Sequence, residues 1–160
     1  MYELSEIRWL PANKLTGSLR LLTSTLGATA LFLAASLWPL TSQGSSPADV
    51  ATFKSTGSCP GCDLSGAFLD TVDAQGGDMW NADMSNASLY RAVLDQADLS
   101  GADLSGANLT RATLNGADLS NTSLLSADLT DATFSLANTT GVLTDASTTC
   151  PDGTAGPCDL

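Results

Sequence analysis

Residues 62–141 read CDLSG AFLDT VDAQG GDMWN ADMSN ASLYR AVLDQ ADLSG ADLSG ANLTR ATLNG ADLSN TSLLS ADLTD ATFSL ANTTG. The stretch divides into 16 pentapeptides in a single frame, without an insertion or a deletion. The third position is Leu in 11 of the pentapeptides, and the first position is Ala in 12. A period this strict decides the fold ahead of any local preference for helix or strand, because each unit must repeat the same backbone path.

A period of five residues excludes both regular secondary structures. In a straight helix each residue turns the chain by ~100°, so apolar residues five positions apart would be spread over all sides of the helix. In a flat strand an odd step moves the side chain to the opposite face. A short extended piece followed by a corner satisfies the pattern, provided that the first and third side chains point inward. The chain then coils around its own core, and neighbouring coils bond to one another at ~4.8 Å as in a parallel solenoid.

The third residue of each pentapeptide is therefore the predicted core ladder. Two units depart from the pattern, with Ala74 and Thr139 at this position. Because Gly76 and Gly77 follow Ala74, we expect the first coil to be the most distorted. The ladder consists of Leu64, Leu69, Met79, Met84, Leu89, Leu94, Leu99, Leu104, Leu109, Leu114, Leu119, Leu124, Leu129 and Phe134.

The most regular units identify a family. Residues 97–101, 102–106 and 107–111 read ADLSG, ADLSG and ANLTR, a pattern that resembles the pentapeptide-repeat family. The resemblance implies an all-β fold, a right-handed quadrilateral parallel β-helix with four pentapeptides per coil. Residues 62–141 would then form about four coils.

The segments that flank the repeats are predicted to be caps, because an open coil exposes its core and unpaired backbone groups. Residues 49–66 resemble the start of the repeat domain in exported cyanobacterial members of the family, where a short helix precedes Cys-Pro-Gly-Cys. We therefore assign residues 41–61 to a linker and an N-terminal cap. Residues 142–160 are assigned to a C-terminal cap.

The composition restricts the function. The 160-residue chain has 17 acidic residues, 6 basic residues and no histidine, with a net charge of −11. Such a charge repels a phosphate backbone, so we expect no nucleic-acid partner. The lack of histidine removes the usual general base and the commonest transition-metal ligand. Because a solenoid with a filled interior offers no catalytic pocket, we expect a non-enzymatic protein without a cofactor or a metal.

The amino end predicts the localisation. Residues 21–40 are an uncharged run of 20 residues, the length that crosses ~30 Å of hydrocarbon. Three basic residues precede the run, which places residues 1–20 as a leader on the cytoplasmic side. Two outcomes stay open, a single-pass membrane anchor and a signal peptide cleaved near Ala48. With the family resemblance, both outcomes predict a repeat domain in the thylakoid lumen or the periplasm.

The four cysteines flank the repeats in pairs. Cys59 and Cys62 precede the repeats, and Cys150 and Cys158 follow them. In an exported domain such cysteines are read first as disulfides, and three pairings are formally open. If a rigid solenoid separates the two ends, the Cα atoms could not approach within about 7 Å across it, which favours Cys59 with Cys62 and Cys150 with Cys158. The alternative is a redox-active Cys59–Cys62 pair.

Outward residues separate into acidic and aromatic sets. If four pentapeptides form one coil, aspartates four units apart stack into columns, and like charges ~5 Å apart are expected to raise some of their pKa values. We interpret the columns as a solubilising side whose aspartates form local turn bonds, and weak binding of Ca²⁺ or Mg²⁺ between stacked carboxylates is the alternative. The columns are Asp63, Asp83 and Asp103, and Asp78, Asp98 and Asp118.

A second set of outward residues is the predicted docking surface for a protein partner, because exposed aromatic and arginine side chains are enriched at interfaces. By the same coil arithmetic, one face carries Phe68, Tyr90, Arg91 and Arg111, with Val93 near the next corner and Trp80 further round. The leading interpretation is an exported structural or interaction protein at a membrane. The family resemblance suggests a photosynthetic membrane complex as the partner. Two alternatives are a thiol–disulfide redox protein and an acidic DNA mimic that inhibits a topoisomerase.

Overall fold

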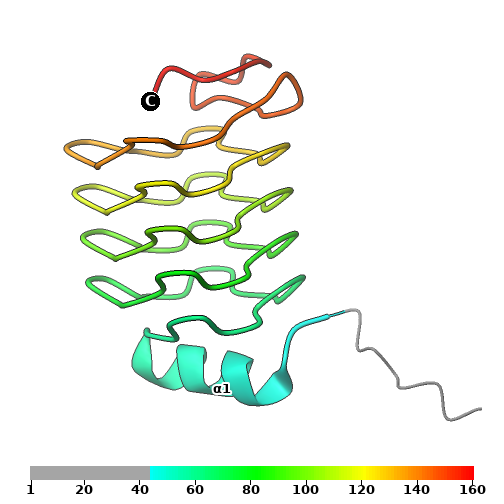
Figure 1. Ribbon diagram of the computed structural model, residues 1–160, viewed down its shortest axis with the longest axis vertical. Helices are drawn as coiled ribbons and strands as arrows, with labels where there is room; N and C mark the ends of the chain where they lie inside the picture. Colours follow the sequence, from blue (N-terminus) through cyan, green and yellow to red (C-terminus); the bar gives the residue numbers. More distant parts are fainter. Residues whose placement is uncertain (1–43) are drawn as a thin grey trace, which may run out of the picture. The chain divides into compact units, whose positions relative to one another are not determined.

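The structure is a computed structural model that describes residues 44–160 (Figure 1). A short helix lies near the start of this part of the chain. Helix α1 (Pro47–Thr56) follows Ser46, whose hydroxyl accepts a hydrogen bond from Asp49 N at 3.4 Å. Proline suits the first turn because an N–H there would have no partner within the helix. Gly57 ends the helix with φ of 72°, a left-handed conformation that glycine adopts without steric cost. The sequence therefore marks both ends of this element.

Corners recur at the same position of each pentapeptide along the rest of the chain. From Gly61 to Gly141, every fifth residue has a positive φ, with values between 54° and 74°. This left-handed residue turns the chain onto the next side of the coil and restores the inward phase of the next unit. The corner that the pentapeptide period requires is thus a β-turn, such as the one closed by Ala67 N donating to Leu64 O at 3.0 Å, whose third residue is left-handed.

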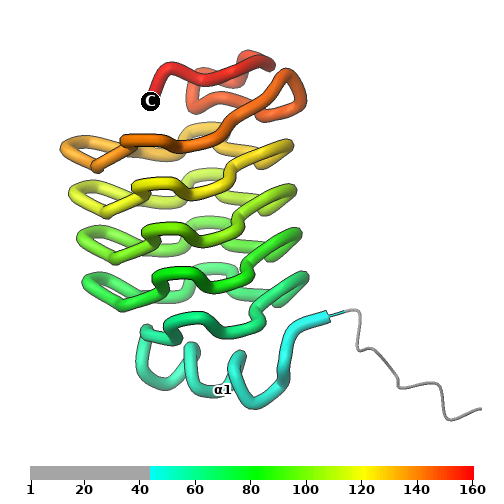
Figure 2. Tube along the Cα trace, in the orientation of Figure 1, coloured from blue at the N-terminus to red at the C-terminus, as the bar shows by residue number. Residues whose placement is uncertain are grey.

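Parallel bridges join each coil to the next, and the bridged residues are four pentapeptides apart, as in the column Asp63–Asp83–Asp103–Ser123–Leu143. One coil therefore contains four corners and has four sides. Figure 2 shows the coils stacked above α1. Each side of a coil contributes one bridged residue. Within residues 44–160 these bridges are isolated, and none extends into a strand of several residues. The fold is therefore a parallel β-helix built from very short extended pieces.

The core is the ladder of third-position side chains. Thirteen of the fourteen predicted ladder residues are at most 1% exposed. Phe134 is only partly buried. The next coil towards the C-terminus forms bridges with Ser123 and Asp128, but none with Thr133 beside Phe134, so this side of the coil is left uncovered. At the opposite end, Phe53 of α1 is fully buried and covers the first coil. The first-position alanines fill the remaining interior.

The first coil keeps its register, contrary to the expectation of distortion there. Ala74 N and Gly76 N donate to Val93 O and Asp95 O at 2.9 and 2.8 Å. Gly77 stands where most units have alanine because a Cβ at this position would collide with the carbonyl of Gly57. The glycine therefore accommodates the end of α1 and does not mark an irregular coil.

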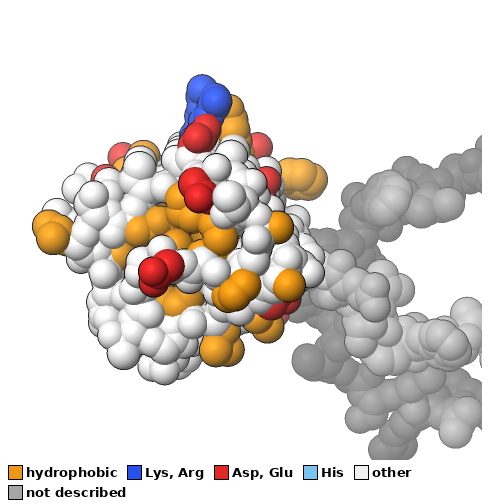
Figure 3. Space-filling model, turned by 90° about the horizontal axis from the view of Figure 1, so that it is seen from above, with side chains coloured by type: hydrophobic (Ala, Val, Ile, Leu, Met, Phe, Trp, Pro, Cys, Tyr) orange, Lys and Arg blue, Asp and Glu red, His pale blue; other side chains and the backbone are white. Residues whose placement is uncertain are grey.

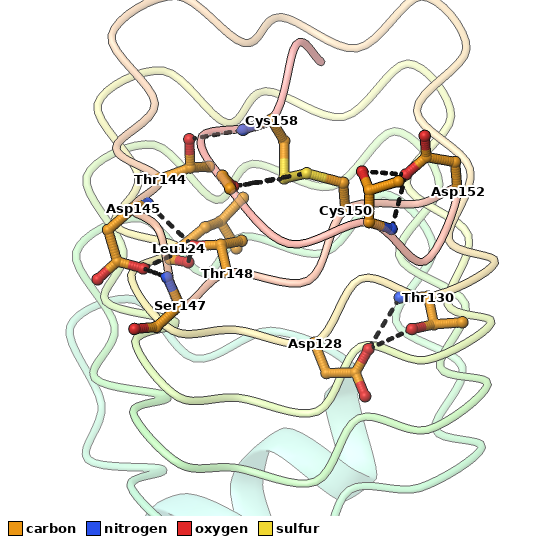
Figure 4. Close-up of a disulfide and its surroundings, with 12 residues drawn as sticks. Leu124, Asp128, Thr130, Thr144, Asp145, Ser147, Thr148, Cys150, Asp152 and Cys158 are labelled. Atoms are coloured by element: carbon orange, nitrogen blue, oxygen red, sulfur yellow. Dashed lines mark hydrogen bonds between the residues drawn. A yellow bond between two sulfur atoms is a disulfide. The ribbon is translucent and has the colours of Figure 1, made fainter.

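The coiled path continues beyond residue 141, into the segment predicted to be a cap. The other parallel bridges join residues 20 positions apart, as in Ser123–Leu143, but Thr149 bridges Asp128, which is 21 positions earlier. One extra residue is therefore accommodated between Leu143 and Thr149. Thr148 is buried there, and its hydroxyl donates to Leu124 O at 3.0 Å. Figure 4 shows the final loop, in which Cys158 N donates to the Thr144 hydroxyl at 3.1 Å.

The predicted single-pass membrane localisation is corrected by the structure. Among the helices of residues 44–160, none has the length and apolar character that crossing a bilayer requires. The predicted anchor or signal segment, residues 21–40, lies outside the described residues, as does the leader. We therefore do not retain the membrane localisation.

Candidate functional site

The acidic columns are present, and their aspartates form local turns. Bridges connect Asp63 to Asp83 and Asp83 to Asp103, and a second series connects Asp78, Asp98 and Asp118. In five of these six residues, Oδ1 accepts a hydrogen bond from the backbone N–H two residues later, at 2.9–3.1 Å. Such Asx-turns stabilise the corner that follows. The columns thus have a structural use within each coil.

Stacking does not raise the pKa of Asp118, contrary to the expectation for some of these carboxylates. The pKa of Asp118 is lowered, mainly because Ser120 N donates to its carboxylate, with smaller contributions from the Ser120 hydroxyl and Asn138. Hydrogen bonds to the ionised form favour that form. The hydrogen bonds of the local turn therefore outweigh the partial desolvation of this carboxylate, which acts in the opposite direction.

Tyr90, Arg91 and Arg111 form one cluster at a corner. The two arginines occupy the same corner of successive coils, with φ of 56° and 60°. The guanidinium carbon of Arg91 lies 5.2 Å from the centroid of the Tyr90 ring, which is within cation–π range. Arg111 Nε donates to Asp131 Oδ2 at 3.2 Å. Seen from the C-terminal end, basic side chains project from one edge of the solenoid (Figure 3).

The charge of this cluster is stabilised locally. Asp131, and then Tyr90, raise the pKa of the Arg111 guanidinium. Arg91 is exposed and forms no ion pair within the described residues. One guanidinium is thus partly paired, and the other is available to a ligand or a partner.

Phe68 lies on the side of the solenoid that leads to this corner, one coil nearer α1. Its side chain is 80% exposed, and it lines a groove of about 390 Å³ between α1 and the first coil. Pro47, Val50 and Lys54 of α1 line the same groove. An exposed ring beside a preformed apolar groove offers a place for a partner's side chain.

Trp80 and Val93 do not join this cluster. Trp80 is 46% exposed, but it precedes Tyr90 by two pentapeptides, which is half a coil, and so lies on another side. Val93 is partly buried between Asp73 and Thr113, with which it forms bridges. Phe68, Tyr90, Arg91 and Arg111 therefore lie together, and Trp80 and Val93 lie apart from them.

Lys54, Val50 and Pro47 were not predicted as part of the docking surface. They belong to α1, outside the pentapeptide period, so the coil arithmetic that groups outward residues does not apply to them. The sequence did predict a short helix before the repeats. It did not show how this helix packs against the first coil, and so it could not place these three residues beside Phe68.

The cysteines are joined as Cys59–Cys62 and Cys150–Cys158, with Cα–Cα distances of 5.5 and 5.4 Å. Cys59 is 2% exposed, and its sulfur lies 3.7 Å from Asp49 O. A carboxylate oxygen of Asp49 and the sulfurs of Cys59 and Cys62 lie within 4.8 Å of one another, the spacing of a possible metal site. Thiolates are the form of cysteine that binds metals, so the disulfide-bonded pair does not supply such ligands.

Comparison with known proteins identifies the repeat. A family described as Pentapeptide repeats matches in eight copies, at residues 59–89, 69–106, 87–125 and 102–141. No curated protein sequence matches the chain.

Several solved structures are similar to this chain. Rfr23, a pentapeptide repeat protein from the cyanobacterium Cyanothece, is 32% identical over 53% of this chain and 61% of its own, with a TM-score of 0.36. A pentapeptide repeat protein from Nostoc is 26% identical over 70% and 85% of the two chains, with a TM-score of 0.45. One from the thylakoid lumen of Arabidopsis thaliana is 30% identical over 64% and 73%, with a TM-score of 0.36. The match thus spans less than two thirds of the Cyanothece protein.

Proposed function

The chain belongs to the pentapeptide-repeat family, and on that premise we propose that it is a non-enzymatic interaction module that binds a protein partner. The family is characterised by a right-handed β-helix, and proteins of this kind generally act as structural or interaction modules. The side that carries Phe68, Tyr90, Arg91 and Arg111 is the proposed docking surface, and the name is kept for these four residues below.

The observation that supports the proposal most directly is the contrast between this side and the acidic columns. The column aspartates bond mainly to the turns of their own coils. The docking surface instead exposes an aromatic ring and an arginine without an ion pair among the described residues. Aromatic and arginine side chains contribute most of the energy in protein interfaces, whereas isolated carboxylates are depleted there.

The disulfides support a working site in an oxidising compartment, because such bonds are rare where thiols are kept reduced. We propose that both cysteine pairs are oxidised in the working protein. A photosynthetic membrane complex as the partner stays a prediction from the sequence.

The redox alternative has less support than docking. A reactive cysteine is partly exposed in an electropositive environment, whereas Cys59 is 2% exposed and lies against Asp49. The topoisomerase alternative stays a prediction, since the local turn bonds of the aspartates account for their regular spacing without it.

Site-specific photo-crosslinking tests the proposed function. A benzoylphenylalanine at position 68 preserves an aromatic ring at the docking surface. The same residue at position 78 serves as the control, because Asp78 follows by half a coil and lies on the opposite side. We expect a discrete crosslinked partner from position 68 that is lost when Tyr90→Ala and Arg91→Glu are added. The same product from position 78, or its persistence in the double variant, would contradict the proposal.

A further inference from the structure

The few cations of the described chain gather on one side. Residues 44–160 contain 15 aspartates and no glutamate, against three cations, Lys54, Arg91 and Arg111. Lys54 lines the groove with Phe68, and the two arginines form the corner at the end of the same side. These cations come from different elements of the chain. On a surface that otherwise repels anions, they create one place where an anionic partner is attracted.

The carboxylates on this side are already bonded. Asp131 accepts from Arg111 Nε at 3.2 Å. Asp70 accepts from Tyr90 N at 3.2 Å and also from the Ser88 hydroxyl. Because each carboxylate has a partner, the exposed Arg91 and the remaining donors of Arg111 are left for a carboxylate from another molecule. A guanidinium binds a carboxylate through two parallel hydrogen bonds, with a geometric preference that a lysine ammonium lacks.

The groove supplies the apolar part of the same surface. Val50, Pro47 and the exposed ring of Phe68 line about 390 Å³ of space beside the Lys54 side chain. This volume is near the lower limit of ligand pockets, roughly 300 Å³, and so suits a single side chain of a partner. The groove and the arginine corner together offer one apolar and one anionic subsite.

Resting on the proposed function, we infer that the docking surface, extended by Lys54 and the groove, binds a protein segment that combines an apolar side chain with adjacent carboxylates. Phe68 and Arg111 lie two coils apart, about 10 Å along the solenoid axis, and three residues apart along one side, about another 10 Å. The resulting diagonal of roughly 14 Å corresponds to about four residues of extended chain. The segment therefore has its acidic pair about four residues from its apolar anchor.

The test uses a fluorescein-labelled, acetylated Gly-Ser peptide in which a leucine is followed, four residues later, by two adjacent glutamates. Fluorescence anisotropy with the full chain measures the dissociation constant. We expect saturable binding that weakens at least tenfold between 50 and 300 mM NaCl, because partly exposed ion pairs are screened. A second peptide with glutamines in place of the glutamates is expected to bind at least tenfold more weakly.

Matched variants locate the binding site. Arg91→Ala with Arg111→Ala removes two positive charges and is expected to weaken binding at least tenfold. Asn81→Asp with Asn121→Asp changes the net charge by the same amount at the diagonally opposite corner, half a coil away, and is expected to change binding less than twofold. Phe68→Ala is expected to weaken binding because it removes the aromatic ring that lines the groove. Circular dichroism melts verify that each variant is folded.

Three results would overturn the inference: equal binding of the glutamine peptide, an equal loss in the Asn81/Asn121 variant, or no binding by the wild-type chain. A peptide with lysines in place of the glutamates that bound more tightly would also overturn it, by showing a basic partner. If the photo-crosslink from position 68 forms while the acidic peptide fails, the proposed function stands and only the partner's chemistry is wrong.

Discussion

Leu104→Ala tests whether the ladder of inward side chains holds the solenoid together. Leu104 is fully buried, in the column between Met84 and Leu124. The substitution deletes three carbon groups, worth about 2.4 kcal/mol of transfer free energy at ~0.8 kcal/mol each. Coil-to-coil hydrogen bonds such as Leu104 N to Ser123 O, at 2.8 Å, prevent the coils from closing over the gap, so a cavity adds to this loss. We expect a total decrease of about 3–5 kcal/mol in the free energy of unfolding.

The assay is urea unfolding followed by far-ultraviolet circular dichroism, with Leu143→Ala as the matched control. Leu143 is 54% exposed, so the same chemical change is expected to cost less than about 1 kcal/mol there. The slope of free energy against urea reports whether the coils unfold together. A repeat protein can lose cooperativity at a weakened interface between coils, and such a loss would appear as a smaller slope in the Leu104 variant.

Equal costs for the two leucine substitutions would refute this reasoning. The stability of the solenoid would then come from the backbone ladder and the Asx-turns, and the inward leucines would be spacers. A cost above about 3 kcal/mol at Leu104 with an unchanged slope, and a small cost at Leu143, would support the buried ladder as the main source of stability.

Three further predictions address single features of the fold. Gly77→Ala is expected to lower the melting temperature by several degrees, because the added Cβ collides with Gly57 O and displaces the end of α1; a melt equal to that of wild type would contradict this. Thr113→Val is expected to be neutral or to stabilise by about 1 kcal/mol in urea unfolding, because the Thr113 hydroxyl has no hydrogen-bond partner in the described structure and Val93 fills the same column one coil away. The pKa of Asp128 is lowered, mainly by the hydroxyl of a neighbouring threonine, so its contribution is complete above the unfolded-state pKa of about 3.9 and is lost as the pH falls through the folded-state value. Titrating stability from pH 6 to pH 2 should therefore show a decline, and the replacement Asp128→Asn should make that decline shallower.

The pentapeptide pattern predicted the core well because it is a local property of the chain. Each corner and each inward pair repeats the geometry of the unit before it, so Leu64 and Leu129 are buried for the same reason. The period does not reveal how many corners close a coil. The register of four pentapeptides per coil came from the family resemblance, and in the structure it is seen in bridges such as Asp63–Asp83.

The candidate site was predictable only where it follows the same period. Tyr90, Arg91 and Arg111 were placed together because the two arginines are four pentapeptides apart and the tyrosine is adjacent to one of them. Trp80 was included on its residue type, although the same period already places it further round the coil. Lys54 was missed because a helix packed against the first coil has no register with the repeats.

What the sequence determines by itself is the coiling of the chain and the identity of its core, since the contacts that stabilise a solenoid lie between successive units with the same pattern. What only the tertiary structure decides is how the ends are closed. Burial of Phe53 and the close approach of Gly57 to Gly77 set the position of α1, and that position creates the groove beside Phe68. These contacts join residues that share no period, so their geometry depends on the packing of the folded chain.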